Sequence, residues 1–332
     1  MTTYIIRRIM LMIPTLIGIT IMVFAISRIA PGDPVSLSMG PGGQLDAQRA
    51  ADVREARMKL YGLDKPVPVQ YAKWFLRVVR FDFGDSLKHH RPVIDIIKER
   101  FPITLTLNLI AFFLIYLISM PMGILAAVKH KRFFDRASSV LLFMLWALPS
   151  MWVGQMMIGY LCGPTFLNWF PPAGLSSNNA EILPFFPWLL DRFWHLTLPV
   201  LCLTYGGFAY LTKQVRAGML ENLRADYVRT ARSKGLSNWT VVIKHAFRNS
   251  VIPVITIMAT LIPALLGGSV IIEQIFSIPG MGMLAFEAVT TRDYNVVMAV
   301  ATIGGLLNLV GLLLGDIAYA MVDPRINFEE TE

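Results

Sequence analysis

The chain has 332 residues, of which 55% are hydrophobic and only 16% are charged, and its mean hydropathy is +0.56. Soluble domains carry roughly 25% charged residues, so this composition excludes a disordered chain and argues against a soluble enzyme. The formal net charge is +8. In a membrane protein such a basic excess records orientation rather than nucleic-acid binding. The two cysteines, Cys162 and Cys202, stand in apolar surroundings and predict neither a disulfide framework nor a metal site.

Six long stretches without charged side chains predict six membrane-spanning helices, because a span needs roughly 20 mostly apolar residues. They are residues 9–27, 101–128, 137–161, 193–212, 249–272 and 295–315. The third stretch continues to Ala180, but Gly163-Pro164 and the turn-forming residues after them end its helix near Leu161. The first stretch is too long for a signal-peptide core and lacks a small-residue cleavage site, so we predict a retained helix. The predicted class is therefore an all-α integral membrane protein.

Lysine and arginine are distributed unevenly among the connections. Segments 1–8, 129–136 and 213–248 contain 14 of them, whereas the short connections 162–192 and 273–294 contain only Arg192 and Arg292. Another 13 lie in 28–100, mixed with acidic residues, and a segment of that length crosses the membrane with little regard to its charge. Cytoplasmic loops carry the positive excess, so this asymmetry predicts cytoplasmic N- and C-termini and makes a nucleic-acid partner unnecessary. The predicted organisation is a first helix at 1–30, an extracytoplasmic cap segment at 31–100, a five-helix core at 101–322 and a cytoplasmic tail at 323–332.

The outer segment 31–100 is too long for a simple turn. Its pattern predicts a polar amphipathic helix at 47–60, an aromatic-rich stretch at 65–80 and a separate short helix at 92–100. Two interpretations remain open from the residues alone. The segment either packs as a small cap on the outer ends of the spans, or it offers a docking surface to an external partner.

The inner segment 213–248 has the signals of two short helices joined by a tight turn. Asp226 is a good N-cap for the first helix, and Gly235 suits the left-handed position that follows a helix. Ser237 can cap a second helix at 238–247. From composition alone, this segment is either a basic loop against anionic lipid or a rigid surface on which a partner acts.

At this segment the sequence resembles the coupling loop of ATP-binding-cassette (ABC) importer permeases, most closely the dipeptide/oligopeptide/nickel branch. The resemblance rests on residues 226–236 (DYVRTARSKGL), 245–249 (HAFRN) and Pro253. Of the broader signature Glu-Ala-Ala-x-x-x-Gly only Ala231 and Gly235 match, which is the habit of the peptide branch. Further motifs follow in the expected order: PGDP at 31–34, GDS at 84–86, GILAA at 123–127, IFSIPGMG at 275–282, RDY at 292–294 and DPR at 323–325.

The resemblance implies the permease subunit of an ATP-driven importer that moves di- or oligopeptides across a bacterial-type cytoplasmic membrane by alternating access. Nickel or glutathione import by the same family remains an alternative. The implied partners are a second homologous permease subunit, two ABC ATPase subunits and an extracytoplasmic substrate-binding protein. The sequence contains no Gly-x-x-x-x-Gly-Lys-Ser/Thr phosphate loop. We therefore expect no enzyme activity and no cofactor on this chain, with MgATP bound by the partner ATPases.

The resemblance assigns ATPase coupling to residues of the inner segment. They are Asp226, Tyr227, Arg229, Thr230, Ala231, Arg232, Lys234, Gly235, Leu236, His245, Arg248 and Asn249. We expect Tyr227, Ala231 and Leu236 to pack into a groove of the ATPase while the cationic residues lie at its rim. The candidate contacts with the external binding protein are Phe276, Pro279, Gly280 and Gly282.

Glu273, at the outer end of the fifth predicted span, has two possible roles. It either forms a hydrogen bond between helices or faces the transport path, where it could meet a peptide N-terminus. Adjacent histidines, such as His89 and His90, point in different directions and do not favour a metal site. A secondary transporter driven by an ion gradient would require inverted repeats and acids at mid-membrane, and the sequence suggests neither.

Overall fold

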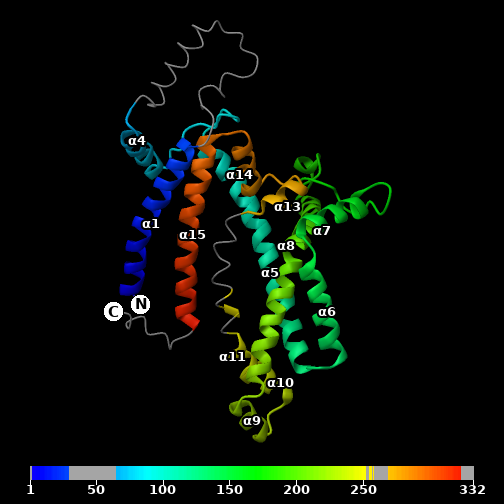
Figure 1. Ribbon diagram of the computed structural model, residues 1–332. Helices are drawn as coiled ribbons and strands as arrows, with labels where there is room; N and C mark the ends of the chain where they lie inside the picture. Colours follow the sequence, from blue (N-terminus) through cyan, green and yellow to red (C-terminus); the bar gives the residue numbers. More distant parts are fainter. Residues whose placement is uncertain (1, 30–64, 252–253, 256, 258–267, 323–332) are drawn as a thin grey trace. The chain divides into compact units, whose positions relative to one another are not determined.

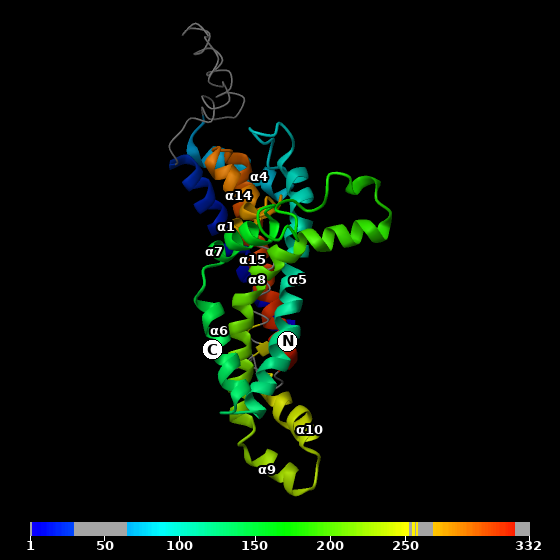
Figure 2. The same ribbon diagram turned by 90° about the vertical axis from the view of Figure 1, so that its right-hand side faces the viewer.

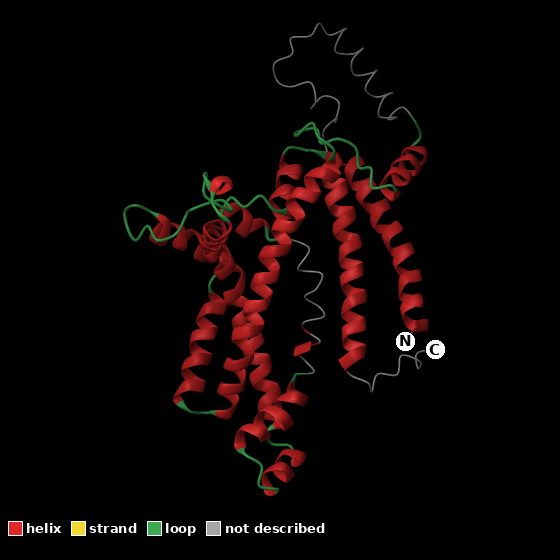
Figure 3. Ribbon diagram, turned by 180° about the vertical axis from the view of Figure 1, so that it is seen from behind, coloured by secondary structure: helices red, strands yellow, loops and turns green. Residues whose placement is uncertain are grey.

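The computed structural model describes residues 2–29, 65–251, 254–255, 257 and 268–322, and these residues form helices and no strands (Figures 1 and 3). The described residues divide into two compact units. One consists of the described residues within 103–283 together with 310–322, and the other of those within 2–102 together with 284–309. The predicted all-helical class is confirmed. The predicted helix at 47–60 and the tail at 323–332 lie outside the described residues.

Within the described part of the chain, three helices are long and apolar enough to cross a membrane: α1 (Thr2–Ile29), α5 (Val93–Val128) and α15 (Tyr294–Val322). They contain the first, second and sixth predicted spans. Other parts of the chain bury only 11% of the most apolar window of α1. The corresponding windows of α5 and α15 are each 28% buried. Apolar helix surface left this exposed is suited to lipid or to a neighbouring membrane subunit.

The third predicted span is broken, and the expectation of one continuous helix there is wrong. α6 (Phe133–Ala147) is followed by α7 (Ser150–Met157) and a π-helical turn, η1 (Ile158–Cys162), with a bend of 92° between them. The cause is Pro149, which favours an extended conformation in the residue before it. Leu148 accordingly has a ψ of 126°.

The fourth predicted span lies inside α8 (Phe185–Asn222), a helix of 38 residues with Pro199 in its interior. Thr197, Thr204 and a glycine pair make this helix less apolar than α1 or α5. The fifth predicted span lies mostly outside the described residues. Its described parts are α11 (Arg248–Ser250) and the start of α13 (Val270–Ile275), which α14 (Met281–Thr290) follows.

The prediction of a separate helix at 92–100 is also wrong, because residues 93–100 form the first turns of α5. No glycine or polar turn sequence stands between Val93 and Phe101, so nothing ends the helix there. The aromatic-rich stretch before it forms α4 (Val67–Val79), whose Trp74 is buried against Phe24 of α1. The two ring centroids lie 5.6 Å apart. α4 therefore packs against α1, and the role of the whole outer segment as a cap stays a prediction.

Candidate functional site

The inner segment forms a helical hairpin beyond the end of α8 (Figure 2). Its first arm is α9 (Asp226–Ser233), and its second arm runs through α10 (Asn238–Thr240), the π-helical η3 (Val241–Phe247) and α11. Ala225, not Asp226, is the N-cap of α9, which corrects the predicted cap. Asp226 is the first helical residue, where its negative charge stabilises the positive end of the helix dipole.

The turn between the arms depends on Gly235. Its φ is +76°, a left-handed conformation that costs residues with a Cβ about 1–2 kcal/mol. Its amide donates to the carbonyl of Arg232 at 3.0 Å. Ser237 caps the second arm as predicted, since its hydroxyl accepts from the amide of Thr240 at 3.3 Å. The sequence signals for this turn are therefore confirmed.

The inner faces of both arms pack against α8. Val228 and Val241 are fully buried in one cluster with Met219 of α8. Ala231 belongs to the same cluster and is only 5% exposed. Packing of Ala231 into a partner stays a prediction, and in this structure its methyl group fills the chain's own core. Such packing makes the hairpin a rigid extension of α8 rather than a loose loop.

Both apolar and basic side chains of the hairpin are exposed. Trp239 is 66% exposed, and Tyr227 and Leu236 are also exposed. Sequence reasoning missed Trp239, although a tryptophan in an otherwise polar segment was a usable signal. The remaining predicted coupling residues are exposed except for half-buried His245: Arg229, Thr230, Arg232, Lys234, Arg248 and Asn249.

A buried ion pair anchors α8 next to this hairpin. Arg216 donates from Nε to Oδ1 of Asp135 at 2.5 Å and from Nη2 to Oδ2 at 2.9 Å. The amide of Lys131 donates to the same carboxylate at 2.8 Å, and His130 Nδ1 lies 3.3 Å from Arg216 Nη2. Two parallel charge-assisted bonds fix both distance and orientation. They tie the inner end of α8 to the start of α6.

Glu273 is buried in the turn that joins α13 to α14. Its carboxylate accepts hydrogen bonds from the Thr104 hydroxyl (3.0 Å), the Ser269 amide (3.3 Å) and the Met283 amide (2.7 Å). The side chain is 2% exposed. Of its two possible roles, the structure supports the hydrogen bond between helices, because no part of the carboxylate is open to a passing peptide.

The residues expected to contact an external protein are mostly buried around this carboxylate. Phe276, Gly280 and Gly282 are buried, and only Pro279 is partly exposed. A Cβ on Gly280 would lie 2.5 Å from the carboxyl carbon of Glu273. Gly280 and Gly282 are thus explained by close packing. Contact of this segment with an external binding protein stays a prediction, for which only Pro279 is partly exposed in this structure.

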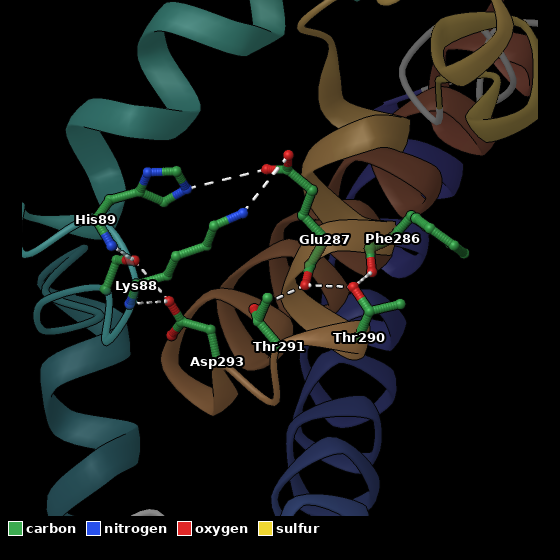
Figure 4. A network of polar contacts seen from close by, with 8 residues as sticks. Lys88, His89, Phe286, Glu287, Thr290, Thr291 and Asp293 are labelled. Carbon is green, nitrogen blue, oxygen red and sulfur yellow. Dashed lines mark hydrogen bonds and ion pairs between the residues drawn. The ribbon is translucent and has the colours of Figure 1, made fainter. Parts of the chain in front are cut away.

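A polar network in the other unit joins two motifs that lie far apart in the sequence (Figure 4). Asp293 accepts a 2.5 Å hydrogen bond from the hydroxyl of Ser86, which precedes it by 207 residues, and one from the amide of Lys88. Glu287 lies 3.7 Å from Lys88 Nζ and 4.0 Å from His89 Nε2. The GDS and RDY motifs are therefore joined by hydrogen bonds within this unit. In the described residues, no group of His, Cys, Asp and Glu could hold a metal ion.

The sequence matches two families of known proteins. Residues 119–328 match the family described as "Binding-protein-dependent transport system inner membrane component", and residues 1–108 match the corresponding N-terminal family. The oligopeptide transport system permease protein AppB of Bacillus subtilis is 42% identical and is covered over its whole length by 99% of this chain. The inner membrane ABC transporter permease protein YejB of Escherichia coli O157:H7 is 37% identical, with the same coverage.

Two further relatives extend these matches. A protein of Agrobacterium fabrum described as the peptidoglycan transport system permease protein YejB is 35% identical over its whole length and the whole of this chain. Among solved structures, a chain of the inward-facing MetNI methionine ABC transporter matches with a TM-score of 0.50 and 14% identity. This match covers 69% of this chain and 97% of that chain. At this identity the likeness concerns the fold alone.

Proposed function

Because the chain belongs to the binding-protein-dependent transport system inner membrane components, the permeases of ABC importers, we propose that it imports peptides by alternating access. Its helical hairpin transmits movement from ATPase subunits to the spans. The proposed assembly contains a second related permease, two ABC ATPases that bind MgATP, and an extracytoplasmic binding protein. The hairpin and both chain termini face the cytoplasm, as the lysine and arginine distribution indicates.

One observation carries the coupling role: the hairpin is rigid on one face and open on the other. Its buried side chains join the core of α8, while Trp239, Leu236 and Tyr227 remain exposed on the outside. When a partner bound to these residues moves, α8 moves with it, because no flexible linker separates the hairpin from α8. Coupling also requires that the docked partner distinguish two states of the permease, because a ligand shifts only an equilibrium whose states it binds differently.

The surrounding charges suit an ATPase surface that carries acidic residues. Arg229, Arg232 and Lys234 lie on the exposed side of α9 and its C-terminus. Rim charges of this kind govern orientation and association rate more than affinity, whereas exposed aromatic residues supply most of the binding free energy. The peptide cargo is inferred from the relatives, whose names describe oligopeptide, peptide and peptidoglycan transport.

The experiment that tests this proposal compares two substitutions at Gly235 in the purified complex in nanodiscs. Gly235→Val places a branched side chain at a positive φ and should remove the stimulation of ATP hydrolysis by loaded binding protein. Gly235→Asn is the matched control, because asparagine tolerates the left-handed conformation. Stimulated hydrolysis and normal uptake by Gly235→Val would refute the coupling role. Failure of ATPase subunits to co-purify with the chain would refute the assembly.

A further inference from the structure

A pocket of about 330 Å³ opens at the break between α6 and α7. Its lining comes from four parts of the same unit: the end of α6, the start of α7, the middle of α8 and the residues around the start of α13. Trp146 and Ser150 flank the break, and Tyr205 and Gly206 line the pocket from α8. Ser269, just before α13, also lines the pocket. The pocket therefore joins segments that no short stretch of sequence connects.

A break within a pair of apolar helices needs an explanation, because backbone groups freed by the break must find partners wherever water is absent. One of them is satisfied here. The hydroxyl of Tyr205 donates to the carbonyl of Leu148, at the break, with a distance of 2.7 Å. Interrupted spans are tolerated where they line a cavity, and in transporters they mark substrate sites. The pocket lies directly beside this interruption.

The walls of the pocket are uncharged. Trp146, Leu203 and Ile272 supply apolar surface, and Ser150 and Ser269 supply hydroxyl groups. Apolar walls with a few polar groups are the usual composition of small-molecule sites. Without a charged wall, the pocket is unsuited to a peptide's terminal ammonium or carboxylate. It is suited to an uncharged side chain, with hydroxyls available for the adjoining amide groups.

Gly206 keeps the pocket open. A Cβ added at Gly206 would meet no atom within 4 Å, whereas one added at the neighbouring Gly207 would lie 2.5 Å from Ile115. The two glycines thus differ: Gly207 permits close helix packing, and Gly206 borders empty space. A larger side chain at Gly206 would enter the pocket without disturbing the packing of α8.

We propose that this pocket is a subsite of the transport path that holds one large apolar side chain of the peptide in transit. The inference rests on the proposed peptide import and adds the residues that contact the cargo. The volume lies near the lower end of the roughly 300–1,000 Å³ typical of ligand sites, which fits part of a peptide rather than a whole one.

The test measures ATP-driven uptake of two tripeptides, Gly-Phe-Gly and Gly-Gly-Gly, by the full complex in proteoliposomes. Gly206→Leu fills the pocket and is expected to lower uptake of Gly-Phe-Gly at least tenfold relative to uptake of Gly-Gly-Gly. The control is Gly18→Leu in α1, where an added Cβ also meets no atom within 4 Å. This control should leave both rates unchanged.

The outcomes separate this inference from the proposed function. If the unaltered complex takes up neither peptide with ATP, peptide import itself is wrong and the subsite falls with it. If it takes up both and Gly206→Leu lowers neither or lowers both equally, only the subsite is refuted. A Ser150→Cys variant made together with Cys202→Ser gives a second measurement, because Cys202 is a free cysteine that also lines the pocket. Thiol labelling at position 150 should be slowed by Gly-Phe-Gly and not by Gly-Gly-Gly, and equal labelling rates would refute the subsite.

Discussion

The guanidinium of Arg216 donates two hydrogen bonds to the carboxylate of Asp135, which lies 81 residues earlier in the sequence. Asp135 is 3% exposed, so its charge depends on this partner and on the Lys131 amide. A buried pair of this kind contributes little net stability compared with an apolar pair, but removing one member leaves an uncompensated charge. The pair therefore acts as a constraint on geometry, holding α8 to α6 beside the hairpin.

We predict that Arg216→Ala lowers the free energy of unfolding by about 3 kcal/mol, because the buried carboxylate of Asp135 then keeps only the Lys131 amide and the nearby His130 ring as partners. Thermal unfolding in detergent, followed by circular dichroism, measures this loss as a lower Tm. The control is Arg91→Ala, which breaks an ion pair between the exposed side chains of Arg91 and Glu99. That control should leave Tm unchanged. Equal Tm values for the two variants would contradict the anchoring role of Arg216.

The turn around Glu273 gives a second prediction. Gly280→Ala should prevent the turn from closing, because the added methyl group would lie 2.5 Å from a carboxyl carbon that three hydrogen bonds hold in place. We expect a marked loss of folded, monodisperse protein in fluorescence-detected size-exclusion chromatography. Gly304→Ala is the matched control, since its Cβ would meet no atom within 4 Å. A normal yield for Gly280→Ala would show that the carboxylate can move aside.

A third prediction concerns Asp293, which also caps α15 through a 3.4 Å bond from the Val296 amide. Asp293→Asn removes the negative charge of Asp293 and one of its two acceptor oxygens. The Ser86 hydroxyl and the Lys88 amide, which donate to that carboxylate, then have a weaker acceptor. A lost hydrogen bond to a charged group costs about 1.5–3 kcal/mol. Amide hydrogen exchange at 86–90 should therefore accelerate. Lys88→Ala, which removes only a half-exposed side chain, should leave that exchange unchanged, and equal rates in both variants would refute the role of Asp293.

The sequence predicts the helices whose hydrophobic runs are uninterrupted, and it fails where a single residue redirects the chain. Composition alone locates α1, α5 and α15, because lipid requires long apolar helices. Composition does not reveal the bend at Pro149, because an apolar run long enough for a span can form either one straight helix or two helices with a bend between them. The turn at Gly235 is predictable because glycine conformation is a local property.

Tertiary pairings are not predictable in this way. Nothing near Asp135 in the sequence indicates that Arg216 is its partner, and nothing near Ser86 indicates Asp293. The same limit applies at Ala231. A motif identifies which residues of a hairpin matter together, but not which face of each helix is buried. The structure assigns Ala231 to the core and leaves Trp239 exposed.

Trp239 gives the final prediction, because it is the largest exposed side chain of the hairpin. Trp239→Ala should leave Tm unchanged, since an exposed side chain contributes little to folding. It should weaken ATPase docking about 30-fold, as expected for a tryptophan that contributes about 2 kcal/mol at an interface. Titration of the purified ATPase onto the permease in nanodiscs measures this affinity. Phe133→Ala, at an exposed aromatic residue outside the hairpin, is the matched control. If both variants bind with the original affinity, the ATPase docks elsewhere and the exposed aromatic surface serves another contact.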